Sequence, residues 1–393
     1  MYDAIIVGAR CAGSATAMLL ARKGYRVLAL ERKSFPSDTM STHYVHAEGL
    51  ARLAAWGLLD TLIATGCPSI DEICSTIEGH RFVSTVPSYD GISVGYCPRR
   101  TVLDQLMVDA ARGSGADIRE GVVVDGLLKD DTGVVTGVRA RSEDVVFDER
   151  ARIVIGADGR RSRVAQLVDA QQYDERPGTA FWYYNYFPSL QLPAMLAFAD
   201  QTGLFMNPTH DGAHVVGAGA RVEHFADFKR DVSANFHRLW RNAAPDIADC
   251  LAETQPLERW VGTADLPGFR RVAFGPGWAL IGDAGFHKDP ITGSGITEAW
   301  VQSEWLAEAI DDGFSGRQLL ADAMHDYQQR RDDHSRDWYE WTHVTARLDP
   351  IPEHISPIFA SLKEDRDGAD RFAMLNAGLV SMKEFYAPFF ARS

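Results

Sequence analysis

The chain has 393 residues, with 40 basic and 54 acidic side chains, a formal net charge of −14 and a pI near 5.3. Hydrophobic residues make up 46% of it, which excludes a disordered chain. So acidic a surface repels nucleic-acid phosphate and anionic lipid. No apolar run approaches the roughly 18 residues of a membrane helix, and five cysteines without a Cys-x-x-Cys pair predict neither a disulfide framework nor a zinc site. We therefore expect a soluble, cytoplasmic protein with no metal, no nucleic-acid partner and no membrane span.

The N-terminal segment alternates strand, tight loop, helix and strand. Residues 3–7 and 26–30 are apolar strands, and residues 14–23 are rich in Ala, Leu and Met, which favour a helix that ends at Gly24. Strands that are apolar throughout are buried on both faces. This pattern predicts a parallel sheet with helices outside it.

Further along, residues 101–112 have helical spacing, and residues 117–140 and 145–155 form strands broken by turns. Short aromatic and β-branched runs at 179–187, 195–199 and 213–219 predict an antiparallel sheet. A strand at 278–281, a Gly/Pro loop and a helix through Ile310 follow, and the remaining residues are mostly helical. One nucleotide-binding layer is thus built from both ends of an α/β chain, with a β-rich module between them.

The first motif, Gly8-Ala9-Arg10-Cys11-Ala12-Gly13, stands where a Gly-x-Gly-x-x-Gly loop joins a strand to a helix. Such a loop brings backbone N–H groups and a helix N-terminus to a pyrophosphate. Glu31, at the end of the next strand, can accept the ribose hydroxyls. Arg10 replaces the second glycine, so its guanidinium either adds a cation near the phosphates or faces solvent. Cys11 is expected to be a small loop filler, although its place near a helix N-terminus could lower its pKa.

Two further motifs also follow apolar strands. The second runs from Val154 through Gly156-Ala157-Asp158-Gly159 into a basic segment, and the third is Gly282-Asp283-Ala284 followed by Pro290, Gly293, Gly295 and a helix. Asp283 can accept a hydrogen bond from a sugar hydroxyl. Gly293 and Gly295 allow close approach of a ligand to the backbone, at the positive end of the following helix.

The three motifs in this order resemble the FAD-dependent monooxygenases of the para-hydroxybenzoate hydroxylase fold, which are related to flavin halogenases and geranylgeranyl reductases. The resemblance covers roughly residues 1–345 and is weak in 166–265. It implies non-covalent FAD, with NAD(P)H as a transient co-substrate. It implies a discontinuous Rossmann-like FAD-binding domain (1–66, 98–165 and 266–345), an inserted antiparallel β-sheet substrate domain (67–97 and 166–265) and a C-terminal helical segment (346–393).

The resemblance also assigns roles to individual residues. The first loop and Glu31 would hold the ADP half of FAD, Asp283 the ribityl chain, and the segment from Pro290 to Ile296 the isoalloxazine. The cofactor-binding set that we predict is Gly8, Ala9, Arg10, Cys11, Ala12, Gly13, Glu31, Arg32, Arg100, Val124, Asp158, Asp283, Pro290, Gly293, Gly295 and Ile296.

Catalytic candidates are the ionisable or flavin-adjacent residues His287, Lys288, Pro290 and His43. A histidine at position 287 could move protons near neutral pH, and a lysine at position 288 could offset flavin charge; an equal alternative is that they only form hydrogen bonds within the loop or face solvent. The aromatic run at 181–187 is a strand whose alternate residues face opposite ways. Either Phe181, Tyr183 and Asn185 or Trp182 and Tyr184 would line an aromatic substrate pocket, and core packing explains such a run equally well. The predicted pocket residues are Tyr44, Trp182, Tyr183 and Tyr184.

These observations favour a single-component FAD monooxygenase that hydroxylates a small or medium, aromatic organic substrate with NAD(P)H and O2. An FAD-dependent reductase or dehydrogenase on the same scaffold is the alternative, and a flavoprotein without turnover a third. Halogenation is least favoured, because the Trp-x-Trp-x-Ile-Pro string of halogenases is absent. The sequence leaves open a monomer or a homodimer.

Overall fold

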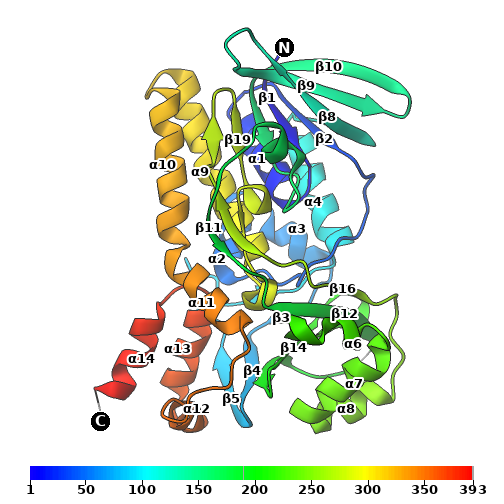
Figure 1. Ribbon diagram of the computed structural model, residues 1–393, viewed down its shortest axis with the longest axis vertical. Helices are drawn as coiled ribbons and strands as arrows, with labels where there is room; N and C mark the ends of the chain where they lie inside the picture. Colours follow the sequence, from blue (N-terminus) through cyan, green and yellow to red (C-terminus); the bar gives the residue numbers. More distant parts are fainter. Residues whose placement is uncertain (189, 392–393) are drawn as a thin grey trace.

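The computed structural model describes residues 1–188 and 190–391, which form a mixed α/β fold (Figure 1). Its first sheet has the central order β18-β19-β10-β1-β2-β7. Strands β1 with β2, β1 with β10, β10 with β19 and β2 with β7 pair in parallel. The strands are β1 (Tyr2–Val7), β2 (Val27–Glu31), β7 (Asp117–Glu120), β10 (Val145–Gly156), β18 (Phe274–Gly275) and β19 (Trp278–Leu280). As predicted, segments from both ends of the chain build this parallel layer.

The two faces of this sheet are covered differently. On one face Ile6 of β1 packs with residues of the helices α1, α4, α9 and α10, as expected. On the other face Ile5 packs with Val124 and Val138 of an antiparallel ribbon, β8-β9-β10. Val164 and Ala165 of the short helix α5 (Arg163–Leu167) belong to the same cluster, so the prediction of helices outside the sheet holds only in part on this second face, which the ribbon also covers. The bounds are α1 (Cys11–Arg22), α4 (Arg100–Gly113), α9 (Gly295–Ser315), α10 (Leu320–His334), β8 (Val122–Lys129) and β9 (Val135–Ser142).

The second sheet lies in the lower half of Figure 1 and has the order β16-β12-β15-β14-β13-β4-β5. Its strands are β4 (Glu72–Ile77), β5 (His80–Thr85), β12 (Ala180–Pro188), β13 (Ala194–Ala199), β14 (Thr202–Pro208), β15 (Ala213–Arg221) and β16 (Val261–Thr263). One face packs against α7 through Phe236 and Trp240 and against α8 through Ile247 and Leu251. The predicted antiparallel sheet is thus present, although β4 joins it parallel to β13. Its covering helices are α6 (Phe225–Phe228), α7 (Val232–Ala243) and α8 (Pro245–Ala252).

The C-terminal part of the chain is helical, as predicted. Phe359, Phe372 and Phe385 form an aromatic cluster that packs on Phe82 of β5. The helices are α11 (Arg336–Ala346), α12 (Ser356–Ser361), α13 (Arg366–Asn376) and α14 (Met382–Phe390). The shorter elements elsewhere are α2 (Ala47–Ala55), α3 (Leu59–Ala64), α5 (Arg163–Leu167), β3 (Ser69–Ile70), β6 (Gly95–Tyr96), β11 (Gln172–Arg176), β17 (Gly268–Arg271) and β20 (Phe286–His287).

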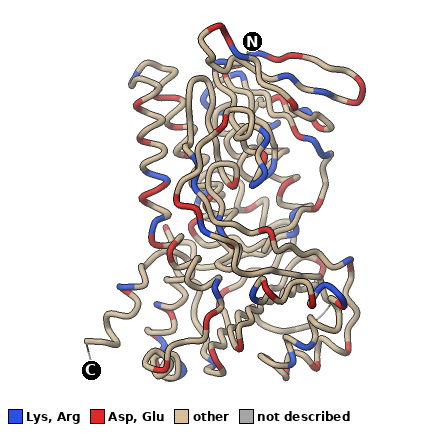
Figure 2. The backbone as a smooth tube through the Cα atoms, viewed as in Figure 1, with Lys and Arg blue, Asp and Glu red and all other residues tan. Residues whose placement is uncertain are grey.

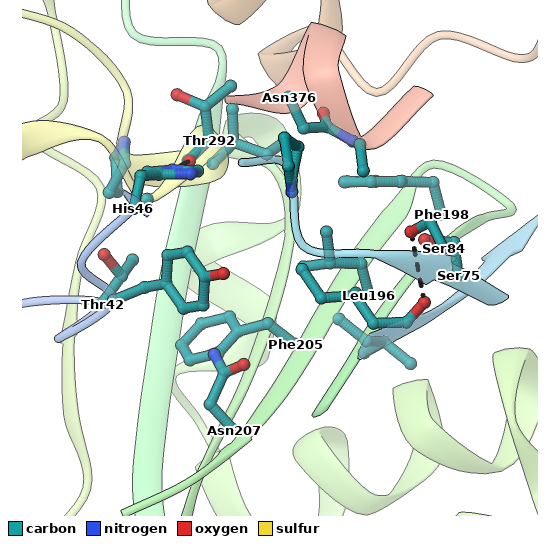
Figure 3. Close-up of a pocket in the computed structure, with 18 of the residues that line it drawn as sticks. Thr42, His46, Ser75, Ser84, Leu196, Phe198, Phe205, Asn207, Thr292 and Asn376 are labelled. Carbon is teal, nitrogen blue, oxygen red and sulfur yellow. Dashed lines mark hydrogen bonds between the residues drawn. The ribbon is translucent and has the colours of Figure 1, made fainter. Parts of the chain in front are cut away.

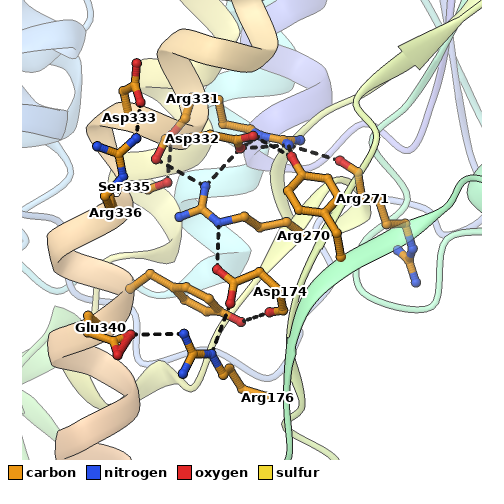
Figure 4. A network of polar contacts seen from close by, with 12 residues as sticks. Asp174, Arg176, Arg270, Arg271, Arg331, Asp332, Asp333, Ser335, Arg336 and Glu340 are labelled. Atoms are coloured by element: carbon orange, nitrogen blue, oxygen red, sulfur yellow. Dashed lines mark hydrogen bonds and ion pairs between the residues drawn. The ribbon is translucent and has the colours of Figure 1, made fainter.

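A buried arginine ties α10 to the strands beside it (Figure 4). Arg331 is 1% exposed and donates hydrogen bonds to the carbonyls of Arg271 (3.0 Å) and Gly285 (3.3 Å) and to the hydroxyl of Tyr173 (2.7 Å). Next to it, Arg270 pairs with Asp332 at 2.9 Å. This network fixes the backbone at Arg271 in β17 and at Gly285 in the third motif.

Charge is mixed over the molecule. In Figure 2 basic and acidic residues alternate along the chain, without a continuous basic path. Within the described ranges no helix is both long and apolar enough to cross a bilayer.

Candidate functional site

A large cavity of about 790 Å³ opens where all three motifs meet. Its lining includes Gly8, Arg10, Cys11, Ala12, Glu31, Arg32, Arg100, Val124, Asp158, Asp283, Lys288, Asp289, Pro290, Gly295 and Ile296. The cavity is within the size range of sites that enclose a whole small-molecule ligand. The fold therefore brings most of the residues predicted to bind a cofactor to one site.

The first loop is compact because its glycines allow close packing. Gly8 has a φ of +93°, and a Cβ there would lie 2.6 Å from the carbonyl oxygen of Ala157, on the second motif. A Cβ on Gly13 would meet the carbonyl oxygen of Gly8 at 1.9 Å. Helix α1 then starts at Cys11 without a side-chain cap. Its first N–H groups are left for a ligand, as a pyrophosphate site requires.

Arg10 is anchored by protein groups. Its guanidinium reaches the buried carboxylate of Asp104 at 2.5 Å and the hydroxyl of Ser37 at 2.8 Å. Asp104 also forms an ion pair with Arg100, four residues earlier on α4, with 2.8 Å between the guanidinium nitrogen and Oδ1. Neither sequence-based interpretation of Arg10 included this partner; the i,i+4 spacing of Arg100 and Asp104 could have indicated their own ion pair, but no local pattern indicates the contact with Arg10. Burial raises the pKa of Cys11 to about 12, so its thiol is not activated by the helix N-terminus.

Glu31 and Asp158 organise the backbone around the cavity. The Glu31 carboxylate accepts the N–H groups of Ala9 (2.9 Å) and Lys33 (3.0 Å), which holds the first loop to the end of β2. Asp158 accepts the N–H of Arg163 at 2.6 Å and the hydroxyl of Ser162, and burial raises its pKa. Both carboxylates thus shape the site as well as lining it.

Asp283 differs from those two carboxylates. It is exposed to the cavity, and no described residue forms a hydrogen bond or ion pair with it. Gly293 has a φ of +65°, and a Cβ on Gly295 would meet no atom within 4 Å. Helix α9 starts at Gly295 without a side-chain cap. The 282–296 loop thus presents a free carboxylate, an open glycine and helix N–H groups to a ligand.

The ionisable catalytic candidates of this loop are held by protein partners. His287 Nδ1 contacts the carbonyl of Pro267, and burial lowers the pKa of this histidine. Lys288 Nζ lies 2.7 Å from Glu298 Oε1, with both side chains buried, and burial lowers the lysine pKa. Lys288 still lines the large cavity, and it lies 4.1 Å from the ring centre of Trp338.

A narrow cavity of about 60 Å³ adjoins the large one, and the two share Thr42, Trp182, Phe205 and Pro290. In Figure 3 His46 and Thr292 lie on one side, Ser75, Ser84 and Leu196 on the other, and Asn376 at a third. The sequence analysis missed His46, the sheet residues and the contribution of α13, Ala373 and Asn376. A pattern of apolar residues gives no sign of which cavity they line.

The structure shows which of the two predicted sets of residues on β12 faces the cavities. Trp182 and Tyr184 face the cavities, and Tyr44 lines the narrow one. Tyr183 points to the opposite face of the sheet and stacks on Phe228 with ring centres 5.3 Å apart. Its prediction as a pocket residue is therefore corrected, because successive strand residues alternate between faces.

His43 is fully buried, with a φ of +66°, and lines neither cavity. Its Nε2 is 2.7 Å from the hydroxyl of Tyr186, and burial first, then Arg100, lowers its pKa to about 3. The structure thus places His43 behind the site as a neutral ring.

These features define the class of the protein. The family model described as the FAD binding domain matches residues 1–331, so the chain belongs to this family of FAD-dependent oxidoreductases. Digeranylgeranylglycerophospholipid reductase 2 of Methanopyrus kandleri is 30% identical over 337 residues, which cover 81% of this chain and 80% of that protein.

Solved structures agree on the fold. The flavin-dependent brominase Bmp2 matches 100% of this chain and 97% of its own with a TM-score of 0.82 and 17% identity. PqsL of Pseudomonas aeruginosa is named a probable FAD-dependent monooxygenase. Its structure matches with a TM-score of 0.74 and 20% sequence identity, and the match covers 95% of this chain and 99% of PqsL. The family and fold inferred from the three motifs are confirmed.

The residues present fit FAD. The uncapped N-terminus of α1 suits the pyrophosphate, the unpaired carboxylate of Asp283 suits a sugar-chain hydroxyl, and the open position at Gly295 leaves room for a ring beside α9. Bound FAD supplies two-electron redox chemistry. The helix N-termini favour negative charge where they face the ligand. The chain's own part is to hold and orient the cofactor.

Proposed function

We propose that the protein is an FAD-dependent monooxygenase that uses NAD(P)H and O2 to hydroxylate a small or medium, neutral aromatic substrate. One observation carries the proposal: a narrow, uncharged cavity meets the large cavity at Pro290 and Trp182. A flat ring in the narrow cavity would lie next to the isoalloxazine that we assign to the 282–296 loop.

The absence of charge supports a neutral substrate. No Lys, Arg, Asp or Glu is among the described residues that line the narrow cavity. Its one histidine, His46, is neutral, because burial lowers its pKa to about 4; its Nε2 lies 2.9 Å from the carbonyl of Thr292. A carboxylate or phosphate would lose its hydration there without gaining an ionic partner. The polar groups of Ser75, Ser84 and Asn207 could instead bind hydroxyl or carbonyl groups.

The aromatic and aliphatic walls support an oxygen-using reaction. Trp182, Phe205, Leu196 and Phe198 give the narrow cavity apolar walls, from which a bound aromatic ring would displace water. Dry surroundings favour transfer of oxygen to substrate over release of hydrogen peroxide.

We also propose the wider assignments that follow from this function. We propose the same FAD-binding domain, substrate domain and C-terminal helical segment that the family resemblance implies. NAD(P)H would bind transiently near Asp158, since no second glycine-rich fingerprint is present in the sequence.

A second candidate is an FAD-dependent reductase, favoured by the similarity to the Methanopyrus reductase. That protein is named for a phospholipid substrate. The narrow cavity has no cation among its described lining residues to hold a phosphate, which favours the monooxygenase.

Isotope labelling separates the two functions. Neutral phenols and naphthols, with the matching carboxylic acids as controls, would be screened for stimulated NAD(P)H oxidation and O2 uptake. We expect one labelled oxygen atom from 18O2 in the product of a neutral substrate. Complete product formation without oxygen would instead establish the reductase.

A further inference from the structure

The 282–296 loop buries a carboxyl group that the sequence analysis did not select. Asp289 is 6% exposed. Its Oδ1 accepts hydrogen bonds from the indole N–H of Trp182 (3.1 Å) and the backbone N–H of Ile291 (2.9 Å). Its Oδ2 is buried and has no hydrogen-bond partner among the described residues.

The local structure explains only one of the two carboxylate oxygens of Asp289. Capping the turn at Ile291 and holding Trp182 require one acceptor oxygen, which asparagine would supply equally well. The second oxygen has lost its hydration and has no protein hydrogen bond in its place, which is costly for a buried polar atom. Orphaned buried polar atoms of this kind call for an explanation, and a ligand that completes the bond is one.

The position of Asp289 identifies that ligand. Asp289 lines the large cavity, and its neighbours Pro290 and Trp182 line both cavities. Asp289 therefore borders the large cavity next to the two residues at which a substrate in the narrow cavity would meet the flavin.

We propose that Asp289 is the general base of the site and removes the proton of a substrate hydroxyl. In this step the substrate O–H bond breaks, its proton bonds to Oδ2, and the electron pair stays on the substrate oxygen. The step involves no oxidant and leaves the total charge of the pocket unchanged. It rests on the proposed function, because an electron-rich phenolate is the form of a phenol that accepts oxygen most readily.

The electrostatics suit this role. Burial raises the pKa of Asp289 to about 7, and the two N–H donors on Oδ1 oppose that rise. A base is most effective when its pKa is near the working pH. The other ionisable groups around the junction of the two cavities belong to the loop, α9, β12, the segment before α2, and α4: Asp283, His287, Lys288, Glu298, Tyr184, Tyr44, His46 and Arg100.

Most of these groups already have partners. Lys288 is paired with Glu298, His287 contacts Pro267, and His46 contacts Thr292. Asp289 combines a raised pKa with an oxygen that has no partner. It is therefore better placed than the histidines to exchange a proton.

The test uses 4-nitrophenol, whose absorption distinguishes its neutral and ionised forms, with the FAD-loaded protein. Asp289→Asn keeps an acceptor oxygen for Trp182 and Ile291 and replaces the second oxygen by an amide NH2 group, which cannot accept the proton. We expect wild-type protein to bind the probe as the phenolate near pH 7 without net proton release, and Asp289→Asn to bind it as the neutral phenol. Identical spectra of the bound probe, or no binding to wild type, would overturn the proposal.

Turnover provides a second readout. With a phenol that wild type hydroxylates, we expect Asp289→Asn to lose at least 100-fold in kcat, with a KM within about threefold and unchanged FAD content. Trp182→Phe removes one donor to the ionised carboxylate, so the acid limb of the kcat profile should move to higher pH. An Asp289→Asn profile equal to wild type would refute the base. If wild type hydroxylates no phenol, the proposed function fails, and the probe spectra still decide the role of Asp289.

Discussion

The glycine at the start of α9 offers a test in which stability and cofactor binding change in opposite directions. A Cβ on Gly295 would meet no protein atom within 4 Å, and the residue is exposed to the large cavity. Gly295→Ala should therefore stabilise the FAD-free protein by up to about 1 kcal/mol, since alanine is the better helix residue.

The same methyl group should weaken FAD binding. It would occupy space that we assign to the isoalloxazine, and an overpacked contact of this kind costs about 1–3 kcal/mol. That cost corresponds to a fall in affinity of roughly 5- to 150-fold. Urea unfolding of the apoprotein measures the first effect, and quenching of FAD fluorescence on titration measures the second.

Gly113→Ala is the matched control. Gly113 is also an exposed helical glycine with open space at its Cβ, but it ends α4 outside the cavity lining. It should stabilise without changing FAD affinity. If Gly295→Ala binds FAD within twofold of wild type, the placement of the ring against α9 is wrong.

Four further predictions follow from the site. Glu31→Ala should weaken FAD binding about 10- to 150-fold, since a hydrogen bond to a charged group contributes roughly 1.5–3 kcal/mol; equilibrium dialysis would check this, and unchanged affinity would exclude the adenosine role. Arg331→Met should lower the free energy of unfolding by about 3–5 kcal/mol, because it leaves the carbonyls of Arg271 and Gly285 and the hydroxyl of Tyr173 without their donor; a loss below about 1 kcal/mol in urea unfolding would contradict this. Trp182→Phe should raise the fraction of NAD(P)H that ends as hydrogen peroxide, while Tyr183→Phe, on the opposite face, should not; equal peroxide yields would refute the assignment of faces. Finally, a folded-state pKa near 7 for Asp289, above its ordinary value of 3.8, means that the folded state holds this proton more tightly. Wild type should lose stability relative to Asp289→Asn as pH rises from about 4 to about 7, and parallel stability curves would show that the pKa is not raised.

The part of the site that binds FAD could be predicted because its chemistry is local in sequence. A glycine loop, a carboxylate at a strand end and a glycine before a helix each follow from a few adjacent residues, and the structure brings Gly8, Glu31, Asp283 and Gly295 to one cavity.

The substrate side could not be predicted in the same way. Its walls combine residues as far apart as Ser75, Leu196 and Asn376, which no local pattern connects. Asp289 was missed for a related reason. Its orphaned oxygen is a property of packing, and an aspartate before a proline resembles an ordinary turn residue in the sequence.

The wall that α13 gives to the narrow cavity has a consequence for how this enzyme can change. Ala373 and Asn376 lie beyond residue 331, where the FAD binding domain match ends. One part of the cavity that we propose for the substrate therefore lies outside the stretch that matches the FAD binding domain, while most of its walls lie inside that stretch. Exchanging α13 would change one wall of the narrow cavity and leave every residue that lines the large cavity in place, so variants of this helix would separate effects on the proposed substrate from effects on FAD.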